Sequence, residues 1–128
     1  MDPLGNLDRY YHFICSALPN SYYDGALGLQ KDPLDPMFNR EDNSWNGAWT
    51  YVGHVDKEGK RWTVEMAIPF KTLGVPPAVP GAIWKMNVGR ERYVQNETRG
   101  DPELSLWSPN LEQRFFGSFD AMGAVVFQ

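Results

Sequence analysis

The chain has 128 residues, of which 12 are basic and 16 are acidic, for a net charge of −4. That charge argues against nucleic-acid binding, because proteins that bind nucleic acids usually carry a basic stripe. No stretch approaches the ~20 consecutive apolar residues of a membrane span, so no membrane partner is expected. With 42% apolar residues, the chain is expected to fold as one domain over residues 1–128.

Aromatic residues make up 14% of the chain, and ten prolines and twelve glycines accompany them. Many aromatic residues together with many turn formers predict short strands joined by loops. The single cysteine, Cys15, has no partner for an internal disulfide. Because it lies in an apolar run, Cys15 is interpreted as a small buried side chain and not as a catalytic thiol.

Residues 10–17 form the first predicted strand. Alternation divides its side chains between two faces: Tyr11, Phe13, Cys15 and Ala17 on one, and Tyr10, His12 and Ile14 on the other. Residues 22–25 predict a turn or the start of a short strand. Residues 30–47 are polar and interrupted by prolines, so they predict the longest loop, and long loops on β scaffolds often carry function.

A strand–turn–strand pattern follows this loop. Residues 49–55 and 61–68 predict two strands, and residues 56–60 predict the hairpin turn between them, with Gly59 at a positive φ angle. Trp62 alternates in phase with other apolar residues of its strand and is therefore expected in the core. Residues 70–74 predict one helical turn that Gly74 closes.

Residues 83–94 predict another strand, in which Trp84 faces the core and Gly89 marks a bulge. Residues 104–107 predict a short strand, and residues 123–127 predict the last one. Short strands without long helices are typical of an all-β fold, here an antiparallel β-sandwich or jelly roll.

A series of motifs runs through the second half of the chain. It comprises Trp-Thr-Val-Glu-Met-Ala-Ile-Pro-Phe at 62–70, Leu-Gly at 73–74, Pro-Gly-x-x-Trp-x-x-Asn-x-x-Arg-x-Arg at 80–92, Leu-Ser-Leu-Trp-Ser-Pro at 104–109 and a closing strand through residue 127. Upstream lie Arg-Tyr-Tyr-His-Phe at 9–13 and a pair of tryptophans, Trp45 and Trp49. The order and spacing of these segments resemble family 9 carbohydrate-binding modules and their relatives in the DOMON-like superfamily, over nearly the whole chain.

The resemblance implies an immunoglobulin-like, DOMON-like β-sandwich that binds a polysaccharide or oligosaccharide, such as xylan or cellulose, and is not an enzyme. Such a module is expected beside a polysaccharide-degrading enzyme, in the extracellular space or the periplasm, although no signal peptide is visible after Met1. Family members have several strands before the segment at 9–13, so an incomplete or strand-exchanged sandwich is expected. Open sheet edges invite pairing with another chain, which predicts a homodimer.

A sugar-binding site needs aromatic rings that stack on the apolar face of the sugar, with polar side chains around the rim. Tryptophans in or beside loops and polar residues near the family motif are therefore the candidate carbohydrate contacts: Trp107, Trp45, Trp49, Arg90, Asn87, Glu65 and Arg92. Each of these tryptophans could instead anchor a loop. The two arginines could instead form a structural ion pair with Glu65 or Glu91.

The resemblance also implies a structural calcium ion, because family members often bind one. The long loop offers carboxylate oxygens, the ligands that calcium prefers, from Asp32, Asp35 and Asp42, with Asn43 beside them. Their spacing does not match an EF-hand loop. A solvated acidic loop is the alternative interpretation of the same residues.

No sequence pattern indicates catalysis, since no H-E-x-x-H, G-x-S-x-G or P-loop motif is present. Two other functions are left open. Some DOMON-like relatives hold haem, and the candidate axial ligands here are His12, His54, Met66 and Met86. Alternatively, the sandwich could serve protein–protein interaction through exposed aromatic residues.

Overall fold

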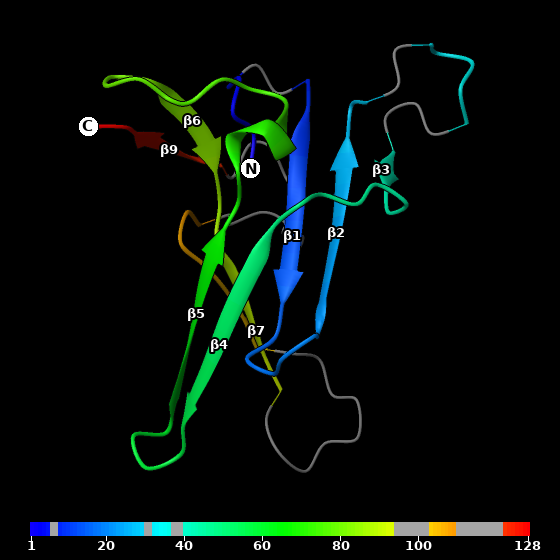
Figure 1. The fold of residues 1–128 in the computed structure, drawn as a ribbon. Helices are drawn as coiled ribbons and strands as arrows, with labels where there is room; N and C mark the ends of the chain where they lie inside the picture. Colours follow the sequence, from blue (N-terminus) through cyan, green and yellow to red (C-terminus); the bar gives the residue numbers. More distant parts are fainter. Residues whose placement is uncertain (6–7, 30–31, 37–39, 94–102, 110–121) are drawn as a thin grey trace. The chain divides into compact units, whose positions relative to one another are not determined.

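A computed structural model describes residues 1–5, 8–29, 32–36, 40–93, 103–109 and 122–128 (Figure 1). Their regular structure consists of β-strands in small antiparallel sheets and one turn of 3₁₀ helix, so the predicted all-β class is confirmed. The chain divides into two compact units. One is residues 8–79, the 8–79 unit; the other is residues 80–128 together with 1–7, the 80–128 unit. Within the described residues, no helix is long and apolar enough to cross a membrane.

The 8–79 unit contains a three-stranded sheet in the order β1-β2-β3 (Figure 1). Its strands are β1 (Tyr10–Cys15), β2 (Tyr22–Leu27) and the two-residue β3 (Glu41–Asp42). The ambiguous segment that begins at residue 22 is therefore a strand, and the predicted long loop contains a short one. The core includes Tyr11 and Leu73, which are joined by a 2.9 Å hydrogen bond from the tyrosine hydroxyl to the leucine carbonyl oxygen.

The two predicted faces of β1 are confirmed by what packs on each. Tyr11 and Phe13 lie against the ring of Trp45, with centroids 5.1 and 5.9 Å away, while Tyr10 and His12 contact Glu41 on the other face. Cys15 was expected to be buried, but it is only half-buried. The expectation was wrong because Cys15 is the last residue of its strand, where packing thins out.

The β4–β5 hairpin of the 8–79 unit consists of β4 (Thr50–Asp56) and β5 (Arg61–Ala67), close to the predicted bounds. The positive φ angle expected at Gly59 occurs instead at Lys60, with φ of 50°. Gly59 lets the carboxylate of Asp56 approach the backbone closely. Its amide donates to Asp56 Oδ1 at 2.8 Å, and a Cβ atom on residue 59 would lie 2.4 Å from Asp56 Oδ2. After the hairpin, η1 (Phe70–Leu73) ends at Gly74, whose φ of 66° confirms the predicted helical turn.

Trp62 was expected in the core, and that prediction was wrong. It is 41% exposed, and its cross-strand neighbour Val55 is exposed as well. Alternation along a strand shows which side chains share a face, but it does not show that a second layer covers that face. Trp84 was assigned to the core by the same reasoning; it is 8% exposed and packs edge-on against Phe127.

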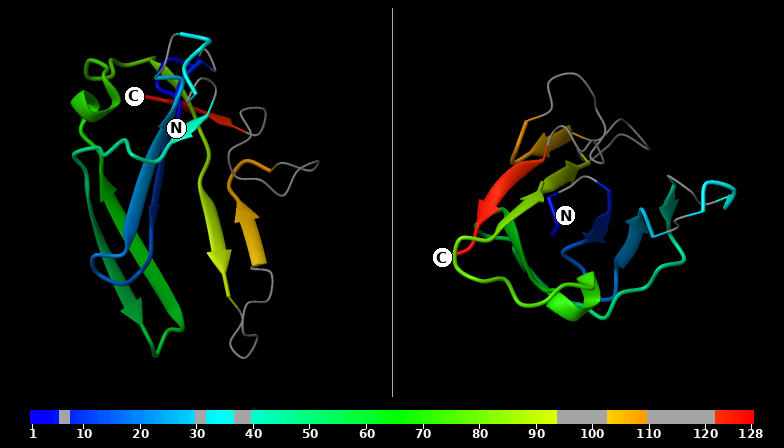
Figure 2. Two further views of the ribbon diagram at one scale, coloured as in Figure 1. Left: turned by 90° about the vertical axis from the view of Figure 1, so that its right-hand side faces the viewer. Right: turned by 90° about the horizontal axis from the view of Figure 1, so that it is seen from above.

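The 80–128 unit contains two antiparallel strand pairs. β6 (Ile83–Met86) pairs with β9 (Gly123–Val126), and β7 (Gly89–Arg92) pairs with β8 (Glu103–Leu106). Figure 2 shows β7 and β8 side by side. Near the N-terminus, Asp2 forms an isolated β-bridge with Lys85 of β6.

A single strand was predicted over residues 83–94, and its described part, residues 83–93, contains two strands. Residue 94 lies outside the described residues. The break falls at Asn87 and Val88, where the side-chain oxygen of Asn87 accepts a hydrogen bond from the amide of Val88. A side chain that bonds to the backbone amide of the next residue in this way competes with the regular ladder of a sheet. β6 and β7 can therefore pair with different partners.

Candidate functional site

Trp107 follows β8 and is 56% exposed, and hydrogen bonds fix the backbone at and after it. Its amide donates to the carbonyl oxygen of Val88 at 2.9 Å. The next residue, Ser108, is held in both directions by Asn87, whose Nδ2 donates to the Ser108 carbonyl at 2.8 Å and whose Oδ1 accepts from the Ser108 amide at 2.9 Å. The exposed indole is therefore attached to a backbone segment that these hydrogen bonds hold in place.

The indole of Trp107 lies against the backbone of β9 at Gly123. A Cβ atom at that position would be 2.7 Å from Cζ3 and 3.0 Å from Cη2 of the indole. Real Cβ atoms do not come so close to a carbon, so only glycine lets the ring rest there. The six-membered ring therefore has a support, while more than half of the side chain is open to solvent.

The register of β7 and β8 groups Trp107 with several polar residues. Arg90 pairs with Ser105 and Arg92 with Glu103, and the Trp107–Val88 hydrogen bond extends the same pairing beyond the strands. Because cross-strand partners share a face and alternate residues return to it, these side chains lie on one side of the ribbon. We call this side the Trp107 face: Trp107, Ser105, Glu103, Arg90, Arg92 and Val88.

The half-buried residue of β8, Leu106, belongs to the opposite side of the ribbon, whereas the side chains of the Trp107 face are exposed. Within that face, Arg92 Nη1 and Glu103 Oε2 form an ion pair of 3.2 Å. Glu103 was not among the partners considered for Arg92 from the sequence, which were Glu65 and Glu91. Such an exposed ion pair is worth less than about 1 kcal/mol, so it contributes little to the stability of the fold.

The predicted sugar contacts divide between the two units. Trp107, Asn87, Arg90 and Arg92 belong to the 80–128 unit, and there Asn87 serves the backbone of Ser108 with both ends of its amide. Three others belong to the 8–79 unit: Trp45, Trp49 and Glu65.

Trp45 and Trp49 are half-buried in an aromatic cluster on β1 and β2. Trp49 contacts Phe13 and Tyr22 with centroid distances of 5.2 and 5.4 Å, and its Nε1 donates to Asp24 Oδ2 at 2.9 Å. The same carboxylate oxygen accepts the amide of Gly47. These contacts fix the segment after β3 to the sheet. Glu65 lies exposed on β5, opposite Val52.

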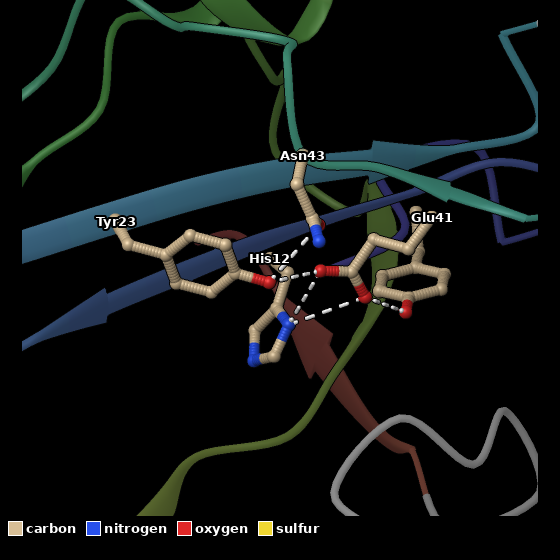
Figure 3. Close-up of polar contacts among 5 residues, drawn as sticks. His12, Tyr23, Glu41 and Asn43 are labelled. Carbon is tan, nitrogen blue, oxygen red and sulfur yellow. Dashed lines mark hydrogen bonds and ion pairs between the residues drawn. The ribbon is translucent and has the colours of Figure 1, made fainter.

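A polar network on the other face of the three-stranded sheet was not foreseen from the sequence (Figure 3). Glu41 of β3 accepts hydrogen bonds from the hydroxyls of Tyr10 and Tyr23, both at 2.6 Å, and from Nδ1 of His12 at 3.2 Å. The Tyr23 hydroxyl also lies 3.1 Å from Oδ1 of Asn43. We call these five residues the Glu41 network.

Glycine makes this network possible. Gly25 pairs with His12 across β1 and β2, and a Cβ atom on it would lie 2.7 Å from Glu41 Oε1. The carboxylate of the third strand can therefore cross β2 and reach the first strand. The sequence signal was weak, because Glu41 lies inside a long polar segment with several other acidic residues.

The Glu41 network shifts the proton affinities of its members. Burial alone would raise the pKa of Glu41, but the hydrogen bonds from Tyr10 and Tyr23 and the charge and hydrogen bond of His12 outweigh it, so the pKa lies below its ordinary value. Burial, followed by the hydrogen bond and charge of Glu41, raises the pKa of Tyr23 to about 12. Glu41 is therefore ionised, and Tyr23 is protonated, at neutral pH.

The predicted calcium ligands are engaged in local turns. Asp32 Oδ1 accepts the amide of Leu34, and Asp42 Oδ1 accepts both the amide and the hydroxyl of Ser44. The amide of Asp35 donates to the carbonyl oxygen of Asp32 at 3.0 Å. In the part of the chain that the structure describes, no group of three or more His, Cys, Asp or Glu side chains is arranged to hold a metal ion. Calcium binding stays a prediction.

The candidate haem ligands are also distributed over both units. His12, His54 and Met66 belong to the 8–79 unit, and Met86 belongs to the 80–128 unit. His12 uses its Nδ1 for Glu41, while His54 and Met66 are exposed. Haem binding therefore stays a hypothesis without a further supporting contact.

Comparison with protein-family models, with curated proteins and with solved structures finds no match to this chain. Its function is therefore argued from the geometry of its own residues.

Proposed function

We propose that this chain is a non-catalytic carbohydrate-binding domain in which the indole of Trp107 is the platform for one sugar ring. The observation that carries the proposal is the combination of 56% exposure with a support from Gly123 and a backbone fixed through Asn87. An isolated apolar side chain on a surface needs no explanation, but an exposed indole held in one orientation is a feature of aromatic binding sites.

The chemistry of a pyranose suits this arrangement. Its axial C–H groups form an apolar face that stacks on an indole, and its hydroxyl groups need hydrogen-bond partners around the rim. Ser105, Arg90 and the Arg92–Glu103 pair share the face with Trp107 and supply donors and acceptors of that kind.

The order of motifs along the chain supports the same proposal, because it resembles family 9 carbohydrate-binding modules. In this proposal the domain serves a polysaccharide-degrading enzyme outside the cytoplasm and directs it to substrates such as xylan or cellulose.

The test is calorimetric titration of the protein with xylo- and cello-oligosaccharides, repeated for Trp107→Ala. Loss of one stacked indole removes about 2 kcal/mol of apolar burial, which weakens binding about thirtyfold. Trp62→Ala is the matched control, because Trp62 is also exposed but lies on the β4–β5 hairpin. Equal weakening by both variants, or no binding of any sugar by the folded wild type, would contradict the proposal.

A further inference from the structure

A second exposed aromatic ring with fixed supports lies in the 8–79 unit. The side chain of Tyr22, the first residue of β2, is 55% exposed, close to the 56% of Trp107. We infer that Tyr22 is a second platform for a sugar ring, separate from Trp107, so that one chain holds two sugars. The choice of a sugar as the ligand rests on the function proposed above.

Two aromatic neighbours fix the orientation of the Tyr22 ring. The ring of Trp49 lies 5.4 Å away at an interplanar angle of 85°, and the ring of Tyr51 lies 5.9 Å away at 64°, both distances being between centroids. Edge-to-face contacts of this kind are a preferred geometry of aromatic pairs. They restrict rotation of the Tyr22 ring, while more than half of the side chain stays open to solvent.

The backbone just before Tyr22 is fixed by the hydroxyl of Tyr51 on β4. Residues 16–21 form the turn between β1 and β2, the β1–β2 turn (Figure 1). The Tyr51 hydroxyl donates to the carbonyl oxygen of Leu18 at 2.6 Å and accepts from the amide of Ser21 at 2.7 Å. One side chain of β4 therefore orients both the ring of Tyr22 and the turn that leads into it.

Further contacts hold the β1–β2 turn in one conformation. The amide of Ser16 donates to the carbonyl oxygen of Ser21 at 2.9 Å, and Ser16 Oγ accepts from the amide of Leu18 at 3.0 Å. Gly53 of β4 lets the turn approach closely, because a Cβ atom on it would lie only 2.8 Å from the carbonyl carbon of Ala17. Tyr22 thus combines exposure with fixed supports, as Trp107 does in the other unit.

The residues around Tyr22 suit an uncharged sugar. A pyranose has an apolar C–H face that can stack on the phenol ring, and its hydroxyl groups need donors and acceptors around the rim. Asn20 and Ser21 are exposed in the β1–β2 turn, and their side chains offer both. The turn itself, Ser-Ala-Leu-Pro-Asn-Ser, contains no charged residue, so it favours a neutral ligand over an ionic one.

The first measurement is the stoichiometry of sugar binding by the wild type. Calorimetric titration with xylotriose and cellotriose is expected to show two sites per chain for the sugar that binds. The site at Tyr22 should be the weaker one, because a phenol ring offers less apolar area than an indole. In Trp107→Ala, one weak site should remain. A single site that Trp107→Ala weakens, with no second site left, would overturn the inference about Tyr22 and leave the proposed function standing.

Variants of Tyr22 then locate the second site. Tyr22→Ala removes the stacking ring, so we expect it to weaken the second site about tenfold and to leave the affinity at Trp107 unchanged. Tyr22→Phe is the matched control, because it keeps the ring and should therefore keep both sites. Circular dichroism checks that each variant is folded, and the stoichiometry of Trp107→Ala tests the inference even if Tyr22→Ala folds poorly.

The remaining outcomes separate this inference from the proposed function. Two sites that survive Tyr22→Ala unchanged would place the second sugar elsewhere and overturn the inference alone. Binding that Tyr22→Ala weakens and Trp107→Ala leaves intact would support the platform at Tyr22 and contradict the one at Trp107. Failure of the folded wild type to bind either sugar would overturn both.

Discussion

Gly123→Ala tests directly whether the indole of Trp107 rests on β9. The added methyl group would lie 2.7 Å from Cζ3 of the indole and 3.3 Å from Cβ of Ser108. Carbon atoms in normal contact are about 3.5–4.0 Å apart, so the ring must withdraw by roughly 1 Å or β9 must shift. Overpacking of this kind lowers the free energy of unfolding by about 1–3 kcal/mol, and the stiffer unfolded chain of an alanine variant offsets about 0.4–1 kcal/mol of that.

We therefore expect Gly123→Ala to lower the free energy of unfolding by about 1–2 kcal/mol and to weaken sugar binding. Urea denaturation followed by circular dichroism gives the first value, and calorimetric titration gives the second. The decisive comparison is made in the Trp107→Ala background, where the ring is absent. There the glycine substitution should lose most of its effect, because the contact it violates no longer exists. The same loss of stability with and without the indole would refute the reasoning.

Three further predictions concern the supports of the two faces. Asn87→Ala should lower the free energy of unfolding by about 2 kcal/mol, because two hydrogen bonds to the Ser108 backbone are lost. It should also weaken sugar binding, although it removes no sugar contact. Unchanged urea denaturation and unchanged calorimetric titration would count against the role of Asn87. The stability that Glu41 contributes should be present above the ordinary carboxyl pKa of 4.5 and lost as the pH falls through the lower pKa of the folded protein. Glu41→Gln should therefore be less stable than wild type at pH 7. It should also flatten the acid limb of the curve of stability against pH. An acid limb that is identical in the two proteins would exclude the Glu41 network as its source. Tyr23→Phe should remove one phenol that ionises near pH 12 from a spectrophotometric titration, whereas an unchanged titration curve would show that Tyr23 is not shifted.

The sequence by itself determined most of the strands and their faces, because alternation is a local property of the backbone. The bounds of β1, β4 and β5 follow the predicted ones closely, and the helical turn closed by Gly74 follows from one glycine at a positive φ angle. The two faces of β1 were also predictable, since successive side chains point to opposite sides of any strand. Where the prediction went wrong, as at residues 83–94, the side chain of Asn87 accepts a hydrogen bond from the amide of Val88, at the point where the ladder ends.

Only the tertiary structure decided which side chains meet. The residues predicted to surround Trp107 have different roles in the structure: Asn87 holds the backbone, Arg92 pairs with Glu103, and the support of the indole is a glycine from β9. Likewise, Trp84 and Trp62 have the same alternating pattern, but one is buried and the other exposed. The physical reason is common to these cases. Spacing along a chain fixes the direction of a side chain, whereas burial and hydrogen bonding depend on segments distant in sequence that only folding brings alongside it.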